Sequence, residues 1–185
     1  MKKLYFLLTM IALNITQSFG QNEKMYNHAI QTGPIGLAMG NYGANYELIV
    51  KQKHGIVLGG SVYSGQGDDG YNMNFQYRKH KMSEKGSSFW GIFFKYSDIN
   101  SEFDWKEKGK KENFKFSSES FVLGPYWGKR WIWKSGFCVL YNFGYGINDT
   151  TFEWKDKIPE HRKLIEGLHK FFSGFQAELS IGFYF

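Results

Sequence analysis

The last fifteen residues of the chain, Phe171–Phe185, read FFSGFQAELSIGFYF. Apart from Ser173, every second residue from Phe171 onward is apolar, and the other parity is mostly glycine or polar. Successive side chains of a β-strand point to opposite faces of the sheet. The segment therefore predicts a strand with one apolar face and one small or polar face.

The same alternation recurs upstream, so the chain predicts a meander of antiparallel strands. The first of these segments is weak and shows the pattern only at Ile35, Leu37 and Met39. Lys129 and Pro125 interrupt the apolar face of another one, since a lysine there must reach toward headgroups and a proline cannot donate to a ladder. The predicted strands before the last lie at 27–39, 44–50, 56–62, 71–78, 90–97, 121–133 and 137–146.

The first twenty residues have the layout of a cleaved export signal. Lys2 and Lys3 precede a nearly uninterrupted apolar run over 4–15, and Ser18, Phe19 and Gly20 follow it. The run is too short for a spanning helix. We expect residues 1–20 to be removed and residues 21–185 to form a single barrel domain.

Composition narrows the class of protein further. Aromatic residues make up 19% of the chain, which has 22 glycines but only three prolines, as expected for strands joined by tight turns. Cys138 is the only cysteine, which excludes an intrachain disulfide. The net charge of +6 gathers in apparent loops such as 106–115 and 155–170. An exported basic surface suits anionic lipid headgroups better than nucleic acid, so no nucleic-acid partner is expected.

The connections between strands set the strand number. Short inner turns are predicted at 51–54, 82–87 and 134–136, and longer outer loops at 64–70, 106–113 and 153–170. Alternate strands cross the membrane in opposite directions. If the C-terminus lies on the inner side, the strand at 44–50 runs from the outer to the inner side, and residues 27–39 must run outward before it. Bacterial single-chain barrels have an even number of strands. The prediction is an all-β fold, an eight-stranded antiparallel up-and-down transmembrane barrel.

Three observations favour a membrane barrel over a soluble one. The polar parity holds Gly, Asn, Ser and Gln rather than the Lys and Glu of a watered surface. The apolar parity is bulky, while eight strands leave a narrow interior that suits small side chains. Large aromatics also fall near strand ends, as in the interfacial girdles of such barrels. The predicted inner girdle is Trp90, Trp131, Trp133, Phe183 and Phe185, and Trp105 and Trp154 lie near the outer rim.

The export signal, the strand pattern and the terminal Phe185 resemble the small eight-stranded outer-membrane barrels of the OmpA and OmpX type, barrel only. The resemblance covers residues 27–185 and includes no catalytic motif. It implies the outer membrane of a Gram-negative bacterium, assembly by the barrel-insertion machinery, and contact with outer-membrane lipid and lipopolysaccharide. A monomer is expected.

The presumed lumen face carries charges that must be paired inside a narrow barrel. We hypothesise that Glu47 and Glu178 pair with Arg78, Arg130 or Lys95 and fill the interior. A water-filled pore is the alternative, but eight strands leave little room for one.

An enzyme acting on lipid acyl chains needs an activated nucleophile beside a base. The five histidines, His28, His54, His80, His161 and His169, show no such arrangement along the sequence, which predicts surface or rim positions for them. His161, Glu166 and His169 lack the spacing of a zinc site. Pro159 and the apolar residues after it predict a short helix packed over the barrel mouth. No metal or cofactor is expected.

The sequence thus predicts a non-enzymatic outer-membrane barrel with a structural or surface-interaction role through the outer loops 106–113 and 153–170. Two alternatives stay open at this point. One is a barrel enzyme that acts on lipid acyl chains, and the other is a soluble exported lipocalin-like binding protein.

Overall fold

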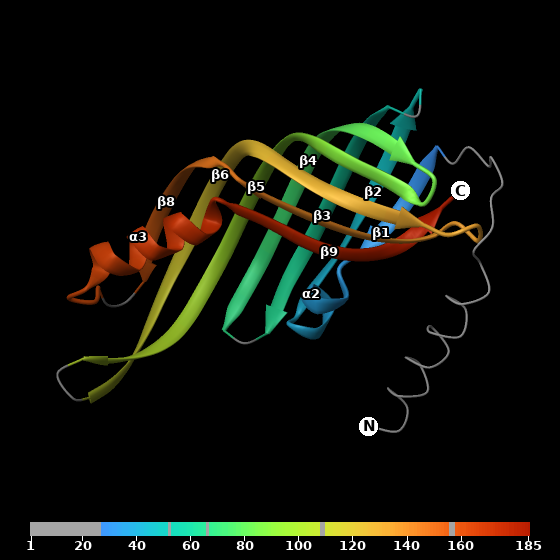
Figure 1. Cartoon of the computed structure of the whole chain (residues 1–185). Coiled ribbons are helices and arrows are strands. Elements are labelled where there is room, and N and C mark those ends of the chain that lie inside the picture. Colours follow the sequence, from blue (N-terminus) through green and yellow to red (C-terminus); the bar gives the residue numbers. More distant parts are fainter. Residues whose placement is uncertain (1–26, 52, 66, 108–109, 156–157) are drawn as a thin grey trace, which may run out of the picture.

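A computed structural model describes residues 27–51, 53–65, 67–107, 110–155 and 158–185, so the predicted export signal lies outside the described residues. One antiparallel sheet contains all the strands (Figure 1). In chain order the elements are β1 (His28–Thr32), α2 (Pro34–Ala38), β2 (Asn41–Val50), β3 (His54–Gly65), β4 (Asp68–Ser83), β5 (Gly86–Glu107), β6 (Lys110–Ile132), β7 (Phe137–Tyr145), β8 (Ile147–Lys155), α3 (Arg162–Ser173) and β9 (Phe175–Tyr184).

The sheet closes on itself as an eight-stranded barrel. β1 pairs with both β2 and β9, and β5 pairs with both β4 and β6, so no edge remains along the closed part. β7 and β8 pair with the same partner, β6, in one constant register, from Tyr126↔Gly144 to Leu123↔Ile147. They are therefore one barrel strand interrupted at Gly146. The predicted eight-stranded antiparallel barrel is confirmed.

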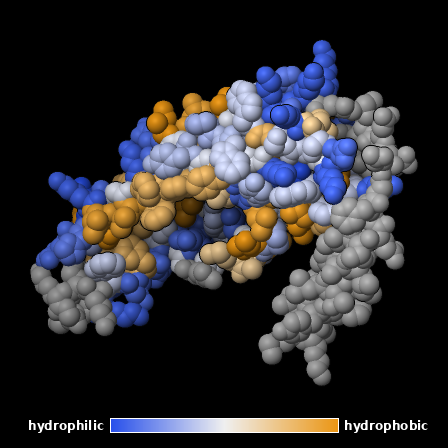
Figure 2. All heavy atoms as spheres, in the orientation of Figure 1, coloured by the Kyte–Doolittle hydropathy of each residue, from blue (hydrophilic) through white to orange (hydrophobic). Residues whose placement is uncertain are grey.

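The alternation of the sequence separates two environments. Side chains of one parity fill the interior, where Arg78, Arg130 and Glu47 are fully buried. The other parity is apolar and exposed around the barrel, for example Met73, Phe75 and Leu123. In Figure 2, apolar residues also gather over α2 and α3, and hydrophilic ones gather toward the two ends of the molecule. The molecule is thus polar inside and apolar outside.

The first predicted strand is wrong in its second half. The strand β1 ends at Thr32, and Ile35, Leu37 and Met39 lie on or just after the helix α2 instead. Pro34 opens this helix, because its fixed φ suits a first helical turn and it has no N–H for a ladder. Gly40 then turns the chain into β2 with a φ of 80°. The alternating apolar residues at 35–39 thus belong to a short exposed helix and the turn after it, not to a strand.

The predicted outer loop 106–113 is also wrong, because strands run through it. The pairing of β4 with β5 ends at Asp68↔Ser101, whereas β5 and β6 stay paired to Glu107↔Lys110. β8 likewise continues beyond the last pair of β7 with β9, Tyr145↔Phe175. Residues 99–107, 110–118, 147–155 and α3 project from the barrel end opposite the C-terminus (Figure 1). We call them the outer extension.

The helix expected from Pro159 is present as α3, but its predicted packing is wrong. Its apolar residues Leu164, Leu168 and Phe172 are exposed rather than packed over the barrel mouth. The side that meets β8 carries His169 and Glu166, which are partly buried. Among the described helices, none is long and apolar enough to cross a membrane.

Candidate functional site

The interior of the barrel is crossed by a central network of Glu47, Arg78, Arg130 and Tyr184. The Oε2 atom of Glu47 accepts hydrogen bonds from Arg78 Nη1 at 3.2 Å, Arg130 Nη1 at 3.4 Å and the Tyr184 hydroxyl at 2.5 Å. The Glu47 and Arg78 side chains are inaccessible to solvent, and that of Arg130 is 1% exposed. Two cations and one carboxylate thus fill the half of the lumen on the side of the C-terminus.

Neighbouring side chains complete the network. Arg78 Nε donates to the Tyr126 hydroxyl at 3.1 Å, and its Nη2 donates to Gln76 Oε1 at 2.8 Å. Gln31 Nε2 lies 3.1 Å from both Glu47 Oε2 and the Tyr184 hydroxyl. Buried charges are tolerated only when paired and hydrogen bonded in this way. The central network therefore links strands β1, β2, β4, β6 and β9 across the barrel.

Glycine on the lumen face leaves room for this network. A Cβ atom on Gly55 would lie 2.6 Å from Glu47 Oε1 and 2.7 Å from His80 Nε2. A Cβ on Gly59 would overlap the amide of Asn45. The small residues that alternate with the apolar ones in β3 are thus required by the width of the interior.

A Ser–His–Glu chain lies beside the network and was missed from the sequence. Ser87 Oγ is 3.1 Å from His80 Nδ1, and His80 Nε2 is 3.0 Å from Glu47 Oε1. His80 is 6% exposed, so its predicted rim position is wrong. The separation of the three residues along the chain hid this contact; only the inward parity of His80 in its strand indicated it. Ser87 is 1% exposed, and none of the three lines the cavity described next.

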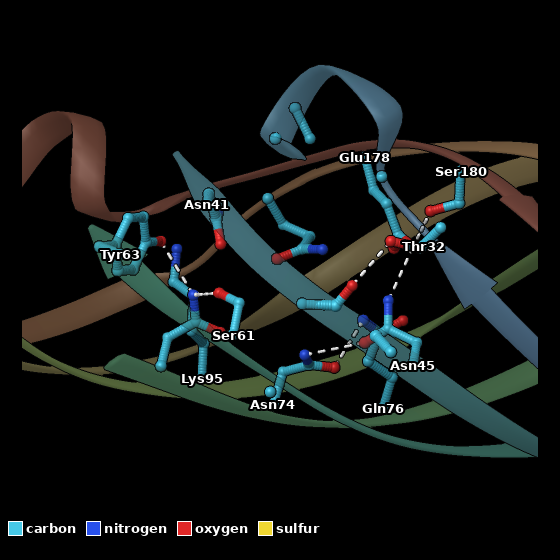
Figure 3. A pocket seen from close by; sticks show the side chains of 18 of the residues that line it. Thr32, Asn41, Asn45, Ser61, Tyr63, Asn74, Gln76, Lys95, Glu178 and Ser180 are labelled. Atoms are coloured by element: carbon cyan, nitrogen blue, oxygen red, sulfur yellow. Dashed lines mark hydrogen bonds between the residues drawn. The ribbon is translucent and has the colours of Figure 1, made fainter. Parts of the chain in front are cut away.

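The outer half of the lumen holds a polar cavity of about 210 Å³. Figure 3 shows amide and hydroxyl side chains turned toward it, and its lining includes Asn45, Asn74, Gln76, Lys95 and Glu178. Glu178 Oε2 accepts from Asn142 Nδ2 at 2.7 Å, and Oε1 accepts from Asn45 Nδ2 at 2.8 Å and from the Ser180 hydroxyl.

The structure brings four of the five predicted lumen residues into contact and leaves one apart. Glu178 lies 3.8 Å from Arg78 Nη2, which joins it to the central network. Lys95 instead donates to the carbonyl oxygen of Phe175 at 3.0 Å and forms none of the ion pairs found among the described residues.

The predicted inner-girdle residues lie on the outer surface at the barrel end that carries the C-terminus. Trp90, Phe183 and Phe185 are more than half exposed, whereas Trp131 and Trp133 are half-buried. The Lys129 ammonium lies 5.1 Å from the centre of the Trp131 ring, a cation–π contact on the apolar face. Trp154, expected near the outer rim, instead packs inside the outer extension.

The outer extension has a small aromatic core of its own. Phe116 is 4% exposed and contacts the rings of Trp154, Phe152 and His169, with ring centres 5.2, 5.8 and 5.4 Å away. Trp154 Nε1 donates to Glu166 Oε1 of α3 at 2.8 Å. Burial against these rings lowers the pKa of His169, which the charge of Asp68 partly opposes. The extension is therefore a folded unit.

The described residues hold no group of three or more His, Cys, Asp or Glu side chains arranged to bind a metal ion. Glu166 is engaged with Trp154 and with Arg162, 3.4 Å away, while His169 lies among aromatic rings. Asp68 accepts from the Ser101 hydroxyl at 2.7 Å.

Among known proteins, this chain is similar to solved structures alone. No protein-family model matches the sequence, and no curated protein matches it. The crystal structure of CarO from Acinetobacter baumannii is similar at 11% identity with a TM-score of 0.42. The match covers 89% of this chain and 100% of that chain. The fold assignment therefore rests on the closed sheet itself.

Proposed function

We propose that this protein is an integral outer-membrane barrel of a Gram-negative bacterium. Its interior is closed to the passage of ions, and its outer extension engages the lipid of the outer leaflet, lipopolysaccharide in particular. The exposed apolar side chains around the barrel, here called the apolar band, support insertion in a membrane. Closure of the sheet supports it too, because lipid cannot satisfy the hydrogen bonds of free strand edges. A soluble carrier would need the opposite orientation, with its apolar parity inside. Insertion by the barrel-insertion machinery and a monomeric state remain predictions.

The observation that carries the proposal is the continuity of α3 with the apolar band. The ring of Phe171, at the end of α3, lies 5.9 Å from that of Tyr145 and 5.2 Å from that of Phe175, both on the barrel wall. Leu164 and Leu168 extend this surface along the helix, 58% and 51% exposed. Exposed apolar surface of this kind marks an interaction site. An amphipathic helix with this face lies in the membrane interface.

Lysines beside the apolar face of α3 suit phosphate-bearing lipid. Lys163 and Lys170 are exposed on the same helix. Cationic side chains near an anionic membrane surface each contribute about 1 kcal/mol of attraction. We expect lipopolysaccharide to raise the melting temperature of the reconstituted protein. The double variant Lys163→Gln/Lys170→Gln should lose most of this shift.

The depth of α3 is tested with spin labels on single cysteines, with Cys138 changed to Ser. A label at Leu168→Cys should be accessible to oxygen and shielded from a water-soluble nickel chelate. A label at Asn113→Cys, on the β5–β6 hairpin of the outer extension, is the control and should be accessible to the chelate. Equal access of the chelate to both sites would overturn the placement of α3.

The matched control for the Lys163→Gln/Lys170→Gln variant is Lys79→Gln/Lys81→Gln at the other barrel end. This variant should keep the full rise in melting temperature with lipopolysaccharide.

The sealed interior is tested by planar-bilayer recording of the purified protein. The central network fills the lumen of a barrel that is already narrow at eight strands. We expect no steady conductance from the wild-type protein. Stable large channels in that protein would show that the lumen is open, and would favour a pore instead.

A further inference from the structure

The barrel wall has a lateral gap between β2 and β9 in its outer half. The pairing of β1 with β9 runs from the hydrogen bonds between His28 and Phe185 to Thr32↔Ile181 and stops there. The chain then leaves the sheet into α2 and returns at Asn41 as β2. Residues 175–180 of β9 therefore pair with β7 on one side and, among the described strands, with none on the other.

Within the described part of the chain, α2 alone covers this gap, and it does so thinly. None of its residues is buried, and its apolar residues Ile35 and Leu37 are exposed, as is Met39 just after it. Gly33 and Gly36 line the lumen cavity with bare backbone. The Thr32 hydroxyl donates to the Gly43 carbonyl at 2.7 Å, which ties the end of β1 to β2 beside the gap. At Gly33 and Gly36 no side chain stands between the backbone and the cavity. In Figure 2 the surface is hollowed beside α2.

The cavity behind the gap holds a lysine that forms none of the ion pairs found among the described residues. Glu178 is matched by Asn142, Asn45, Ser180 and the nearby Arg78. Lys95 faces the same cavity and has a backbone carbonyl, not a carboxylate, as its hydrogen-bond acceptor (Figure 3). The amide side chains around it offer both donors and acceptors. The cavity therefore suits a small anionic group that also accepts hydrogen bonds.

We propose that this cavity binds the anionic headgroup of an amphiphile, which enters through the lateral gap while its chain stays in the bilayer beside α2. An amphiphile matches both surfaces, because the cavity is polar and Ile35, Leu37 and Met39 at the gap are apolar and exposed. A free sheet edge facing lipid is costly unless its polar groups are satisfied. The headgroup provides such groups at the edge of β9. Phosphate and carboxylate headgroups share this chemistry.

The test is photo-crosslinking in lipid nanodiscs with diazirine probes that carry the reactive group next to the headgroup. One probe is a phosphatidic acid, the second a fatty acid, and the third a phosphatidylcholine of no net charge. Mass spectrometry of the labelled peptides should place the anionic probes at residues 33–41 and 175–180. Lys95→Gln should lower this labelling by about fivefold or more, in keeping with the loss of a charge-assisted hydrogen bond. Lys129→Gln, which removes an exposed lysine of the outer surface, should not change it.

Each outcome decides a separate point. Labelling by the phosphate probe alone identifies a phospholipid headgroup, and labelling by the carboxylate probe alone identifies a fatty acid. Equal labelling by all three probes, or labelling spread around the barrel without enrichment at the gap, would overturn the proposal. So would unchanged labelling of Lys95→Gln, provided that a heat-modifiability gel shows this variant folded. The proposal rests on the proposed insertion of the barrel in a bilayer, which the heat-modifiability gel checks separately, but none of these outcomes depends on the membrane contact of α3.

Discussion

Glu47 and Tyr184 are 137 residues apart in the chain and share a 2.5 Å hydrogen bond in the middle of the barrel. The contact joins the second strand to the last one across the closed sheet. It also places the tyrosine hydroxyl on the carboxylate that receives Arg78 and Arg130. The stability of the barrel therefore depends on a single buried carboxylate.

Replacement of Glu47 by glutamine should destabilise the barrel strongly. It removes the only fully buried carboxylate among the described residues and leaves Arg78 and Arg130 without their shared partner. Breaking a buried ion pair in this way costs about 3–5 kcal/mol. Urea unfolding in vesicles, followed by the gel mobility of the folded form, measures this loss. The control is Glu119→Gln at an exposed site, with an expected change within about 0.5 kcal/mol. Equal midpoints for the two variants would refute the role given to Glu47.

Gly55→Ala tests whether the width of the lumen limits the sequence. The new Cβ would lie 2.6 Å from Glu47 Oε1 and 2.7 Å from His80 Nε2, so both side chains must move. Overpacking of this kind costs about 1–3 kcal/mol. Gly167→Ala, on α3 with nothing within 4 Å of its Cβ, is the control and should be neutral or slightly stabilising. The same unfolding midpoints compare them, and a Gly55→Ala protein as stable as the control contradicts the prediction.

The docking of α3 should weaken at acidic pH. Burial lowers the pKa of His169 below its ordinary value of 6.5, so the unfolded segment binds a proton more readily than the docked one. The stability of docking is therefore complete above about pH 6.5 and falls as the pH drops toward the lowered pKa. Hydrogen exchange of residues 162–173 as a function of pH measures it.

Two variants separate His169 from other titrating groups. His169→Phe should remove the pH dependence of exchange in α3, because the ring remains but cannot be protonated. His161→Phe, at an exposed position just before the helix, should keep it. Wild-type exchange protection in α3 that stays constant down to about pH 5, where an ordinary histidine is charged, would count against the prediction.

Ser87 should not react with a fluorophosphonate probe in the folded protein. Its distances to His80 and onward to Glu47 suit a catalytic chain, but its hydroxyl is buried and Glu47 is held by two arginines. A nucleophile needs access as well as an activating base. Labelling that disappears in Ser87→Ala, but not in Ser88→Ala, would revive the enzyme alternative. An altered lipid A acyl pattern on expression would support that alternative further.

The parity of side chains predicted most of the barrel, because a polar interior and an apolar outer surface impose a period of two on every strand. The prediction from parity failed where apolar residues alternate for a reason other than a strand. Ile35, Leu37 and Met39 alternate in the sequence yet lie in or beside a short helix, since Pro34 ends the ladder. Charge at 106–113 indicated a loop, but a hairpin that projects from the barrel can be charged and still paired.

The candidate site was predicted in its composition and not in its detail. Inward parity identified Glu47, Arg78, Arg130 and Glu178, which the structure places within one connected set of contacts. Lys95 shares that parity, but it lies nearer the outer extension, where it donates to the carbonyl of Phe175. The Ser87–His80 contact depends on a turn between two neighbouring strands, and the lateral gap depends on the length of β1. Neither height along the barrel nor strand length follows from alternation alone.

The shortness of β1 has a consequence for the order of folding. Its few pairs with β9 join the two ends of the described chain. These contacts are the most distant in sequence, and such contacts form late because the loop between them must close first. Tyr184 and Gln31 reach Glu47 from these two strands. The carboxylate cannot gather its partners while the sheet is still an open ribbon. The charges at the centre therefore assemble only when the cylinder shuts, and they hold it shut afterwards.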